Sequence, residues 1–243
     1  MKRQHVSGGC AQTPIVEDWQ LTPEGGAIHP GERIAVIADV HLGYEWARGA
    51  AGDCVPAHSL AETLKKLERL LERSPIDCLV VAGDLVESPR PCARTAADLA
   101  RLALWLGERG VRLVLIEGNH DRSLAGMARE KGLDAVVPAP VLQSHLLVAG
   151  WTIAHGHRLV PADRLISGHH HPVLRVSGHS APCFLVGDGR IILPAFSGNA
   201  AGLDVASARL PDGWLRSSLR CLASTGGDLL DFGPLKTLHA RLG

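Results

Sequence analysis

The sequence predicts an α/β fold with a parallel sheet at its centre. Three short apolar runs, residues 34–38, 77–82 and 111–116, have the length and composition of strands that are buried on both faces. Two segments between these runs carry apolar residues at helical spacing. Strands that alternate with helices form a βαβαβ unit with parallel strands. A chain of 243 residues is long enough for one sizeable domain of this class.

The elements of this first half can be justified in order. Residues 16–28 alternate short apolar stretches with turn residues, which predicts an edge strand or hairpin before the first buried run. Gly49, Gly52 and Pro56 interrupt residues 43–56, so we expect a loop there. Leucines at helical spacing predict a helix from residue 60 until Ser74 and Pro75 end it. A second helix is expected over residues 95–108.

The second half has a different pattern. After a short predicted helix over 123–130, the sequence favours short strands with tight turns. These strands are residues 135–137, 145–148, 151–154, 164–167, 183–186 and 190–193, and the turn 187–189 predicts a hairpin between the last two. Residues 203–206 and 214–219 favour two more strands before a polar tail. We therefore expect one domain over 1–243, with a catalytic core at about 33–200, an N-terminal hairpin at 15–32, and C-terminal strands and a tail at 201–243.

Composition excludes some partners. Lys plus Arg and Asp plus Glu number 25 each, so no overall basic field recruits nucleic acid or an anionic membrane. The six cysteines are scattered and form no C-x-x-C pair, which is typical of a reduced, cytoplasmic protein. The N-terminus lacks the apolar segment of a signal peptide. No run approaches the roughly 18 apolar residues that a membrane span needs, so we expect a cytoplasmic protein without a membrane partner.

Polar clusters follow the predicted strands. The five clusters, in chain order, are Asp39-Val40-His41, Gly83-Asp84, Gly118-Asn119-His120-Asp121, His155-Gly156-His157 and Gly168-His169-His170-His171. The carboxyl ends of parallel strands meet at one edge of a sheet, where ligands bind, so the fold can gather side chains that are distant in sequence. Five of the 13 histidines lie between residues 155 and 171, which indicates metal or phosphate chemistry.

The residue types favour particular metals. Imidazoles, carboxylates and one amide suit Mn, Fe or Zn better than Ca or Mg. Each cluster alone has an ordinary explanation, because Gly-Asp is common in turns and a single His is usually structural. Five such clusters, each after an apolar run, together indicate a two-metal hydrolytic site. Neither a G-x-S-x-G elbow nor a phosphate-binding G-x-x-x-x-G-K-[ST] loop is present to compete for this role.

The same five clusters resemble the five-block signature of the calcineurin-like metallophosphoesterases. This resemblance implies a four-layer α/β/β/α sandwich, with two mixed central sheets flanked by helices and a binuclear centre between the sheets. It further implies one metal held by Asp39, His41 and His171, and a second held by Asn119, His155 and His169, with Asp84 bridging the two. His120 resembles the histidine that contacts the substrate phosphoryl group and protonates the leaving group, and Asp121 resembles the acid that orients it. The implied ions are two divalent metals, Mn²⁺ first, with Fe, Zn or Ni as alternatives.

Three stretches carry a narrower resemblance, to the ICC-like branch of DNA-ligase-associated phosphoesterases and archaeal relatives of recombination nucleases. They are residues 27–30, residues 38–45 and Gly168-His169-His170-His171-Pro172, and the stretches 182–184 and 193–196 extend the match. Residues 197–202 follow the ligase-associated members only loosely. DNA ligase or helicase partners are possible by this resemblance alone, and we do not assign the ligase partnership to this chain.

The expected reaction is an in-line displacement at phosphorus by a water that the metals activate. Arg48 and Arg122 lie beside the clusters and are candidates for gripping a second phosphate or a nucleic-acid backbone. Alternatively, each arginine is an ordinary surface residue whose side chain faces solvent and binds no substrate. His157 either tunes His155 or faces solvent.

Three functions remain open on the sequence. The first is a phosphodiesterase or nuclease acting on nucleic acid, and the second is a phosphatase or phosphodiesterase of a small nucleotide or metabolite. The third is a catalytically idle protein-binding scaffold, which the intact ligand pattern and His120 argue against. Neutral net charge does not favour the first function, whereas the branch resemblance does. Oligomeric state is not indicated by the sequence.

Overall fold

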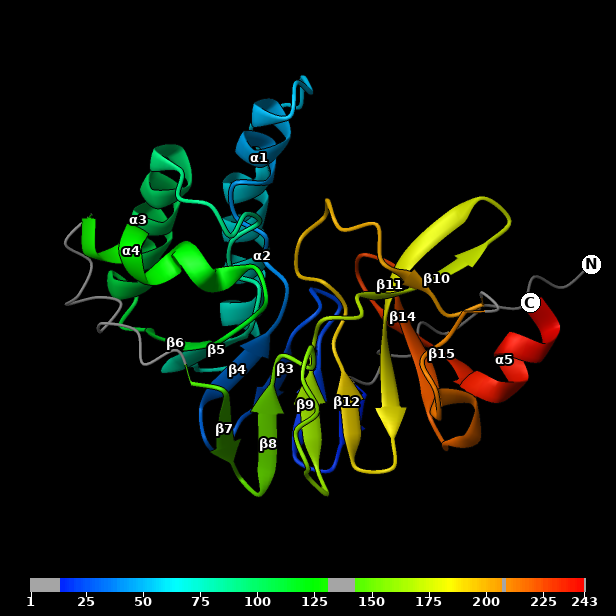
Figure 1. Ribbon diagram of the computed structural model, residues 1–243. Coiled ribbons are helices and arrows are strands. Elements are labelled where there is room, and N and C mark those ends of the chain that lie inside the picture. The colour runs from blue at the N-terminus through cyan, green and yellow to red at the C-terminus, as the bar shows by residue number, and fades with distance from the viewer. Residues whose placement is uncertain (1–13, 131–142, 207–208, 243) are drawn as a thin grey trace, which may run out of the picture.

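The computed structural model describes residues 14–130, 143–206 and 209–242. The first of its two sheets has six strands in the order β1 to β6 (Figure 1). These strands are β1 (Ile15–Val16), β2 (Trp19–Leu21), β3 (Ala27–His29), β4 (Ile34–Ile37), β5 (Cys78–Ala82) and β6 (Arg112–Ile116). The hairpin strands β1 to β4 pair antiparallel, and β4, β5 and β6 pair parallel. The predicted N-terminal hairpin and parallel βαβαβ unit are therefore confirmed.

The second sheet is also mixed and has nine strands within the described residues. The strands are β7 (His145–Val148), β8 (Trp151–Ala154), β9 (Leu165–Ser167), β10 (Pro172–Val176), β11 (His179–Gly187), β12 (Arg190–Ile192), β13 (Leu203–Asp204), β14 (Arg220–Ser224) and β15 (Leu229–Pro234). Its centre runs β11-β12-β9-β8, with β12, β9 and β8 parallel to one another. The predicted hairpin of β11 and β12 is confirmed by the antiparallel pairing of Gly187 with Arg190.

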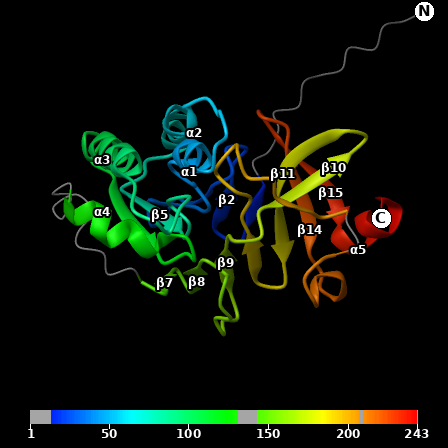
Figure 2. The same ribbon diagram turned by 45° about the horizontal axis from the view of Figure 1, so that its top comes forward.

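Five α-helices flank the sheets in the described part of the chain. They are α1 (Tyr44–Ala50), α2 (Ser59–Arg73), α3 (Ala93–Gly107), α4 (Leu124–Glu130) and α5 (Leu235–Leu242), with short 3₁₀ turns at Asp121–Ser123 and Trp214–Arg216. Helices α1 to α4 lie together over the first sheet, whereas α5 lies at the opposite end beside β14 and β15 (Figures 1 and 2). In the described residues, no helix is both long and apolar enough to cross a membrane.

Three hydrophobic cores separate the four layers. Alternate residues of β4 point to opposite faces, so Ala35 and Ile37 pack under the helices while Val36 and Ala38 pack between the sheets. The middle core receives residues of the second sheet such as Phe184. A third core lies between the outer face of the second sheet and α5. This is the expected α/β/β/α sandwich with two mixed sheets.

The structure corrects several predictions. The expected loop at 43–56 contains helix α1, and Trp46 of this helix donates a hydrogen bond to Asp98 of α3 at 2.7 Å, a contact between distant residues that helps to hold the helix in place. The expected strand at 214–219 is a 3₁₀ turn, and the strand β14 begins only at Arg220. Strands β10 and β15 and helix α5 were not predicted. The predicted strand at 135–137 lies outside the described residues.

Candidate metal centre

The carboxyl ends of five strands bring the candidate residues to one edge, between the two sheets. Asp39 and His41 follow β4, Asp84 follows β5, and Asn119 and His120 follow β6. From the second sheet, His155 follows β8, while His169 and His171 lie between β9 and β10. All of these candidates, predicted from clusters up to 132 positions apart in sequence (171 − 39), contribute to one connected set of contacts.

The backbone of this edge is strained. Ten described residues other than glycine have positive φ, and five of them are candidate ligands: Asp39, His41, Asp84, His169 and His171, with φ between 46° and 71°. The left-handed region costs a non-glycine residue about 1–2 kcal/mol, so surrounding contacts must impose it. Strain of this kind concentrates at functional sites, and here it coincides with the clusters that the sequence singled out.

Neighbouring loops impose that backbone conformation. Asp39 N–H donates to Gly83 O at 3.0 Å, and His41 N–H donates to Asp84 O at 3.0 Å, so the loop after β4 runs along the loop after β5. From the second sheet, His169 N–H donates to Asp39 Oδ2 at 2.9 Å. The Asp39 carboxylate is thereby held between the two sheets before any cation binds.

The motif glycines allow these loops to approach closely. A Cβ on Gly168 would lie 2.4 Å from Ala38 Cβ and 2.5 Å from Asp39 Oδ2. A Cβ on Gly118 would lie 2.1 Å from Asp84 Oδ1. Real Cβ atoms do not approach that closely, so these two glycines are required by packing and not by turn geometry alone.

One group of metal-ligand atoms comprises Asp39, His41 and His171, whose donor atoms lie within 4.8 Å of one another. His171 Nε2 lies 3.0 Å from Asp39 Oδ1 and 3.5 Å from His41 Nε2. These are the three residues that the family resemblance assigns to one metal.

A second group comprises Asp39, Asp84 and His155, all of them buried. His155 Nε2 lies 3.3 Å from Asp84 Oδ2 and 3.1 Å from Asn119 Oδ1. The His155 and His169 rings are 5.0 Å apart between centroids. The residues expected at a second metal are thus adjacent, and Asp39 stands next to both groups.

The donor set fits a cation. Asp39 Oδ1 is buried and accepts no hydrogen bond, although imidazole nitrogens lie nearby. Lone pairs that face one another at such distances repel unless a proton or a metal ion lies between them. Burial opposes the charged form of His155, but Asp84 and Asp39 outweigh it and raise the pKa of this imidazole.

The other titrating groups agree with a metal-ligand role. Burial opposes ionisation of Asp84, yet hydrogen bonds from His155 and from the His120 amide outweigh it and lower the pKa of Asp84 to about 2. Burial, together with the neighbouring His155 and His170, lowers the pKa of His169 to about 4. At neutral pH the first is a carboxylate and the second a neutral imidazole, which are the forms that bind metals.

His120 stands at the rim of the first group. Its backbone N–H donates to Asp84 Oδ1 at 2.9 Å, and its Nδ1 contacts the main-chain carbonyl of Glu87. With Nδ1 so engaged, Nε2 is the ring nitrogen that remains to face a substrate. His41 packs edge to face against it, with 5.4 Å between ring centroids.

Asp121 makes different contacts from those expected. Its carboxylate accepts hydrogen bonds from Val86 N–H at 3.2 Å and Gly118 N–H at 3.0 Å, and burial raises its pKa to about 6. The His120 ring is held by Glu87 O. Asp121 therefore reaches His120 through the backbone of the two loops, and its proposed orienting role stays a prediction.

Glu87 is the residue that sequence reasoning missed. Its Oε2 lies 2.8 Å from His41 Nδ1, and it forms a third group of possible ligand atoms with His41 and His120. A carboxylate on a ligand imidazole fixes its tautomer and increases its basicity. Its position in the sequence could have indicated this role, because Glu87 lies three residues after Asp84 in the loop that follows β5.

The three substrate-binding candidates lie in different surroundings. His157 packs 5.1 Å from the His155 ring and 6.3 Å from the His169 ring, so it belongs to the periphery of the centre. Arg122 is exposed in the 3₁₀ turn next to His120. Arg48, on α1, pairs at 2.5 Å with Asp53, which follows the end of that helix, so its guanidinium is already engaged.

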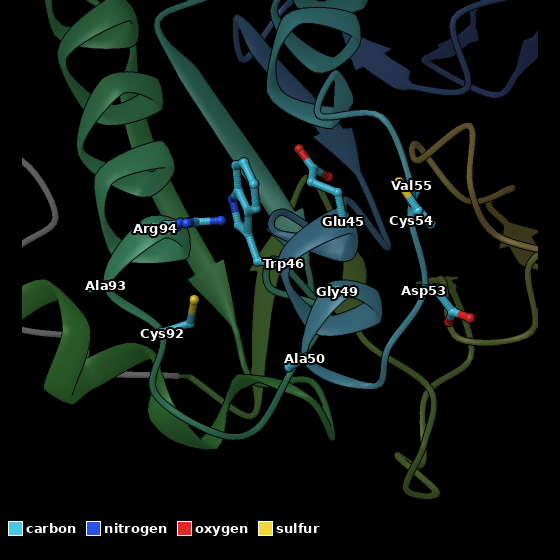
Figure 3. Close-up of a pocket in the computed structure, with 10 residues that line it drawn as sticks. All are labelled: Glu45, Trp46, Gly49, Ala50, Asp53, Cys54, Val55, Cys92, Ala93 and Arg94. Atoms are coloured by element: carbon cyan, nitrogen blue, oxygen red, sulfur yellow. The ribbon is translucent and has the colours of Figure 1, made fainter.

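A cavity of about 560 Å³ lies around the C-terminal part of α1 and the start of α3. Figure 3 shows Arg94 beside the Trp46 ring, with Asp53 on the other side of α1. The Arg94 guanidinium lies 5.0 Å from the ring centroid. The cavity also contains Glu45, a buried acid whose Oε2 has no hydrogen-bond partner.

Comparison with known proteins adds relatives and a structural neighbour. The "DNA double-strand break repair protein Mre11" of Methanopyrus kandleri is 34% identical over 116 residues, which are 48% of this chain and 23% of that protein. The protein of the same description from Archaeoglobus fulgidus is 30% identical over 96 residues, 37% of this chain and 20% of that protein. The chain thus spans less than a quarter of the length of either relative.

The fold resembles that of the Pseudomonas putida nuclease MPE, with a TM-score of 0.67 and 24% identity, over 88% of this chain and 94% of that one. At this level of identity the likeness concerns the fold. Residues 32–186, more than half of the chain, match the family described as Calcineurin-like phosphoesterase. The matched segment holds every candidate ligand described above. The chain therefore belongs to the calcineurin-like phosphoesterase family.

Proposed function

We propose that this protein is a binuclear phosphodiesterase that acts on nucleic acid. The observation that carries the proposal is the convergence of two groups of metal-ligand atoms on Asp39, with His120 at their rim. Spacing of this kind suits two cations that share carboxylates, and such a pair stabilises both the attacking and the leaving oxygen of an in-line displacement at phosphorus.

The proposed ligands are divided between two ions. One ion is held by Asp39, His41 and His171, the other by Asn119, His155 and His169, with Asp84 between them. Manganese is the proposed metal, because the donor set mixes imidazole, carboxylate and amide oxygen; Fe, Zn and Ni are alternatives. When bound, the two ions polarise the phosphoryl oxygens and lower the pKa of a water that attacks phosphorus.

The remaining steps belong to side chains of this chain. His120 is proposed to contact the phosphoryl group and to give a proton to the leaving oxygen through Nε2, since Nδ1 faces the Glu87 carbonyl. Glu87 orients His41 through Nδ1, and Asp121 holds the Gly118 and Val86 backbone on which His120 depends.

Nucleic acid is favoured as the substrate by the relatives. The curated proteins that match part of the chain are described as DNA double-strand break repair proteins, and the structural neighbour is described as a nuclease. Residues 38–45 and 168–172 support membership of the ICC-like branch within the family. The alternative substrate is a small nucleotide or another metabolite ester, for which neutral net charge is no obstacle.

The test compares three substrates after metal reconstitution. Protein freed of metal with a chelator and loaded with Mn²⁺ is assayed on bis-p-nitrophenyl phosphate, single-stranded DNA and cyclic nucleotides. We expect hydrolysis of the first two, and loss of both activities when the chelator is returned. Hydrolysis of cyclic nucleotides without DNA cleavage would favour the small-ester alternative, and no hydrolysis of any substrate would contradict the proposal.

A further inference from the structure

A cavity of about 360 Å³ lies on the outer face of the second sheet, beside the candidate metal centre. Along β9 and β12, Ile166 and Ile191 point into the core between the sheets. Leu165, Ser167 and Ile192 therefore face the other side, where they line this cavity. Helix α5 packs on the same face in a core with β10, β11 and β14 that also includes Ile192, and the cavity lies beside this core.

A row of aromatic rings connects the cavity to the metal centre. The centroids of His155 and His169 are 5.0 Å apart, those of His169 and His170 5.1 Å, and those of His170 and Trp214 5.0 Å. His170 and Trp214 both line the cavity, as does Gly156, which directly follows His155. The cavity is thus one side chain away from a proposed metal ligand.

The lining of the cavity suits a planar, apolar group next to a negative charge. Ile192 and Leu219 are buried and form an apolar floor, whereas Arg158 and Arg190 supply positive charge. Asp212 is the only acid among the described lining residues. A mainly apolar hollow with a few polar groups is the usual form of a small-ligand site, and aromatic and arginine side chains bind nucleobases without sequence preference.

The cavity around α1 is less suited to the same ligand. Its unpartnered buried acid, Glu45, would lie next to a bound phosphate, and the described residues show no comparable row of side chains that joins it to the candidate ligands. The cavity over β9 and β12 has the opposite charge and the shorter connection to the metal centre.

We propose that the cavity over β9 and β12 binds the nucleoside next to the scissile phosphodiester, with its base against Trp214 and His170. Arg158 and Arg190 then face the flanking phosphate. This inference rests on the proposed function and deepens it, because it makes a nucleotide, and not merely a phosphodiester, the recognised substrate. It also assigns a role to the C-terminal segment, from which Trp214 comes.

Two phosphodiesters with the same leaving group test the proposal. One is the p-nitrophenyl ester of thymidine 5′-monophosphate, and the other is methyl p-nitrophenyl phosphate, which has no base. We expect Mn-loaded protein to prefer the thymidine ester in kcat/KM. The substitution Trp214→Leu should reduce that preference about tenfold, the effect of losing one base–aromatic stack. Leucine retains apolar contact with the core that Trp214 shares with α5, so the variant should fold.

The control is Trp105→Leu, on α3 and remote from the cavity. Trp105 is also partly buried and lies under an arginine, Arg109, at 3.8 Å from its ring centroid. Its replacement should leave the preference for the thymidine ester unchanged. A preference that survives Trp214→Leu would overturn the proposal.

A second readout does not depend on hydrolysis. Calorimetry measures binding of thymidine 5′-monophosphate to metal-free protein, and we expect affinity to fall several-fold in Trp214→Leu and in Arg158→Ala. The Arg158 side chain is 68% exposed and, within the described residues, forms only a long ion pair with Glu117, at 4.0 Å, so the variant should fold. Unchanged affinity in both variants, or no binding by the unaltered protein, overturns the cavity assignment. If neither ester is hydrolysed, the proposed function is contradicted. The calorimetric affinities still show whether the cavity binds the nucleotide.

Discussion

The two sheets contribute different chemistry to the metal centre. Loops of the first sheet supply both fully buried carboxylates, Asp39 and Asp84, whereas the candidates from the second sheet are all imidazoles. The negative charge is therefore held by one half of the molecule, which also supplies His41 and Asn119, whereas the other half supplies only imidazoles. This difference means that a bound cation must also join the two halves, since neither sheet alone offers a complete ligand set.

Hydrogen bonds already connect the two halves around Asp39. Phe196, which follows β12, donates its N–H to Ala38 O at 2.8 Å, and Ser197 N–H donates to Asp39 O at 3.0 Å. From α2, Lys66 Nζ donates to Phe196 O at 2.6 Å. The segment that carries Asp39 is thus positioned by residues that follow the second sheet. Substitutions at this contact between the two sheets are therefore informative.

The largest effect is expected for Asp84→Asn, which removes the charge proposed to serve both ions. Both metals should be lost, and turnover of bis-p-nitrophenyl phosphate should fall by more than the about 10²–10⁴-fold that a single general acid supplies. Metal content by mass spectrometry and initial rates measure the result. Asp53→Asn, a change in a partly exposed acid on the surface, is the control. Two bound ions in Asp84→Asn would contradict the bridging role.

His120→Asn should separate chemistry from metal binding. The backbone N–H that serves Asp84 remains, so the variant should keep both ions while turnover falls about 100-fold through loss of the proton donor. The loss should be smaller for a p-nitrophenyl ester, whose leaving group needs no protonation, than for DNA. Full activity on DNA would show that His120 has another role.

Gly168→Ala tests the contact between the two sheets by steric means alone. The new methyl group would lie 2.4 Å from Ala38 Cβ, so the two halves must move apart, at a cost of about 1–3 kcal/mol in the free energy of unfolding. Urea unfolding of metal-free protein measures it. In Gly126→Ala, on α4, the methyl group meets no atom within 4 Å, and helix propensity predicts a gain of up to about 1 kcal/mol. Equal stability of the two variants would contradict the proposed close packing.

The same comparison explains what the sequence could predict. Strands β4, β5 and β6 are covered on both faces, so they appear as runs that are apolar except for Arg112 at the start of β6, and the candidate ligands lie within a few residues of their ends. Strand β15 has mostly exposed side chains and pairs with β14 alone, so it leaves little pattern to detect. Helix α1 depends on distant contacts, such as the close approach of Gly43 to Thr95.

Contacts within the site were less predictable than its members. Residue types and order indicated which side chains would gather, because each cluster follows a strand. The Glu87 carboxylate on His41 and the engagement of Asp121 by backbone amides depend on how two loops pack against each other, which no local pattern encodes.

The smallest expected effect concerns Lys66 and is a change in the free energy of unfolding with pH. Burial, only partly offset by Glu24 and Glu62, lowers the pKa of Lys66 to about 8 from its ordinary 10.5. Its ammonium group donates to Phe196 O and lies 4.2 Å from the centroid of the Phe196 ring. Since the folded pKa is below the unfolded one, the unfolded chain binds more protons between about pH 8 and 10.5, and stability contributed by this residue rises with pH across that window.

Comparison with Lys66→Met isolates that contribution, because the other titrating groups are common to both proteins. The difference in free energy of unfolding should move in favour of the lysine protein by about 1–2 kcal/mol between pH 7.5 and 10, less than the full pKa shift implies because the ammonium group retains some contact with solvent. Urea unfolding of metal-free protein at both pH values measures it. A difference that is constant with pH would show that Lys66 is not desolvated, and that it connects the two halves only as a surface hydrogen bond.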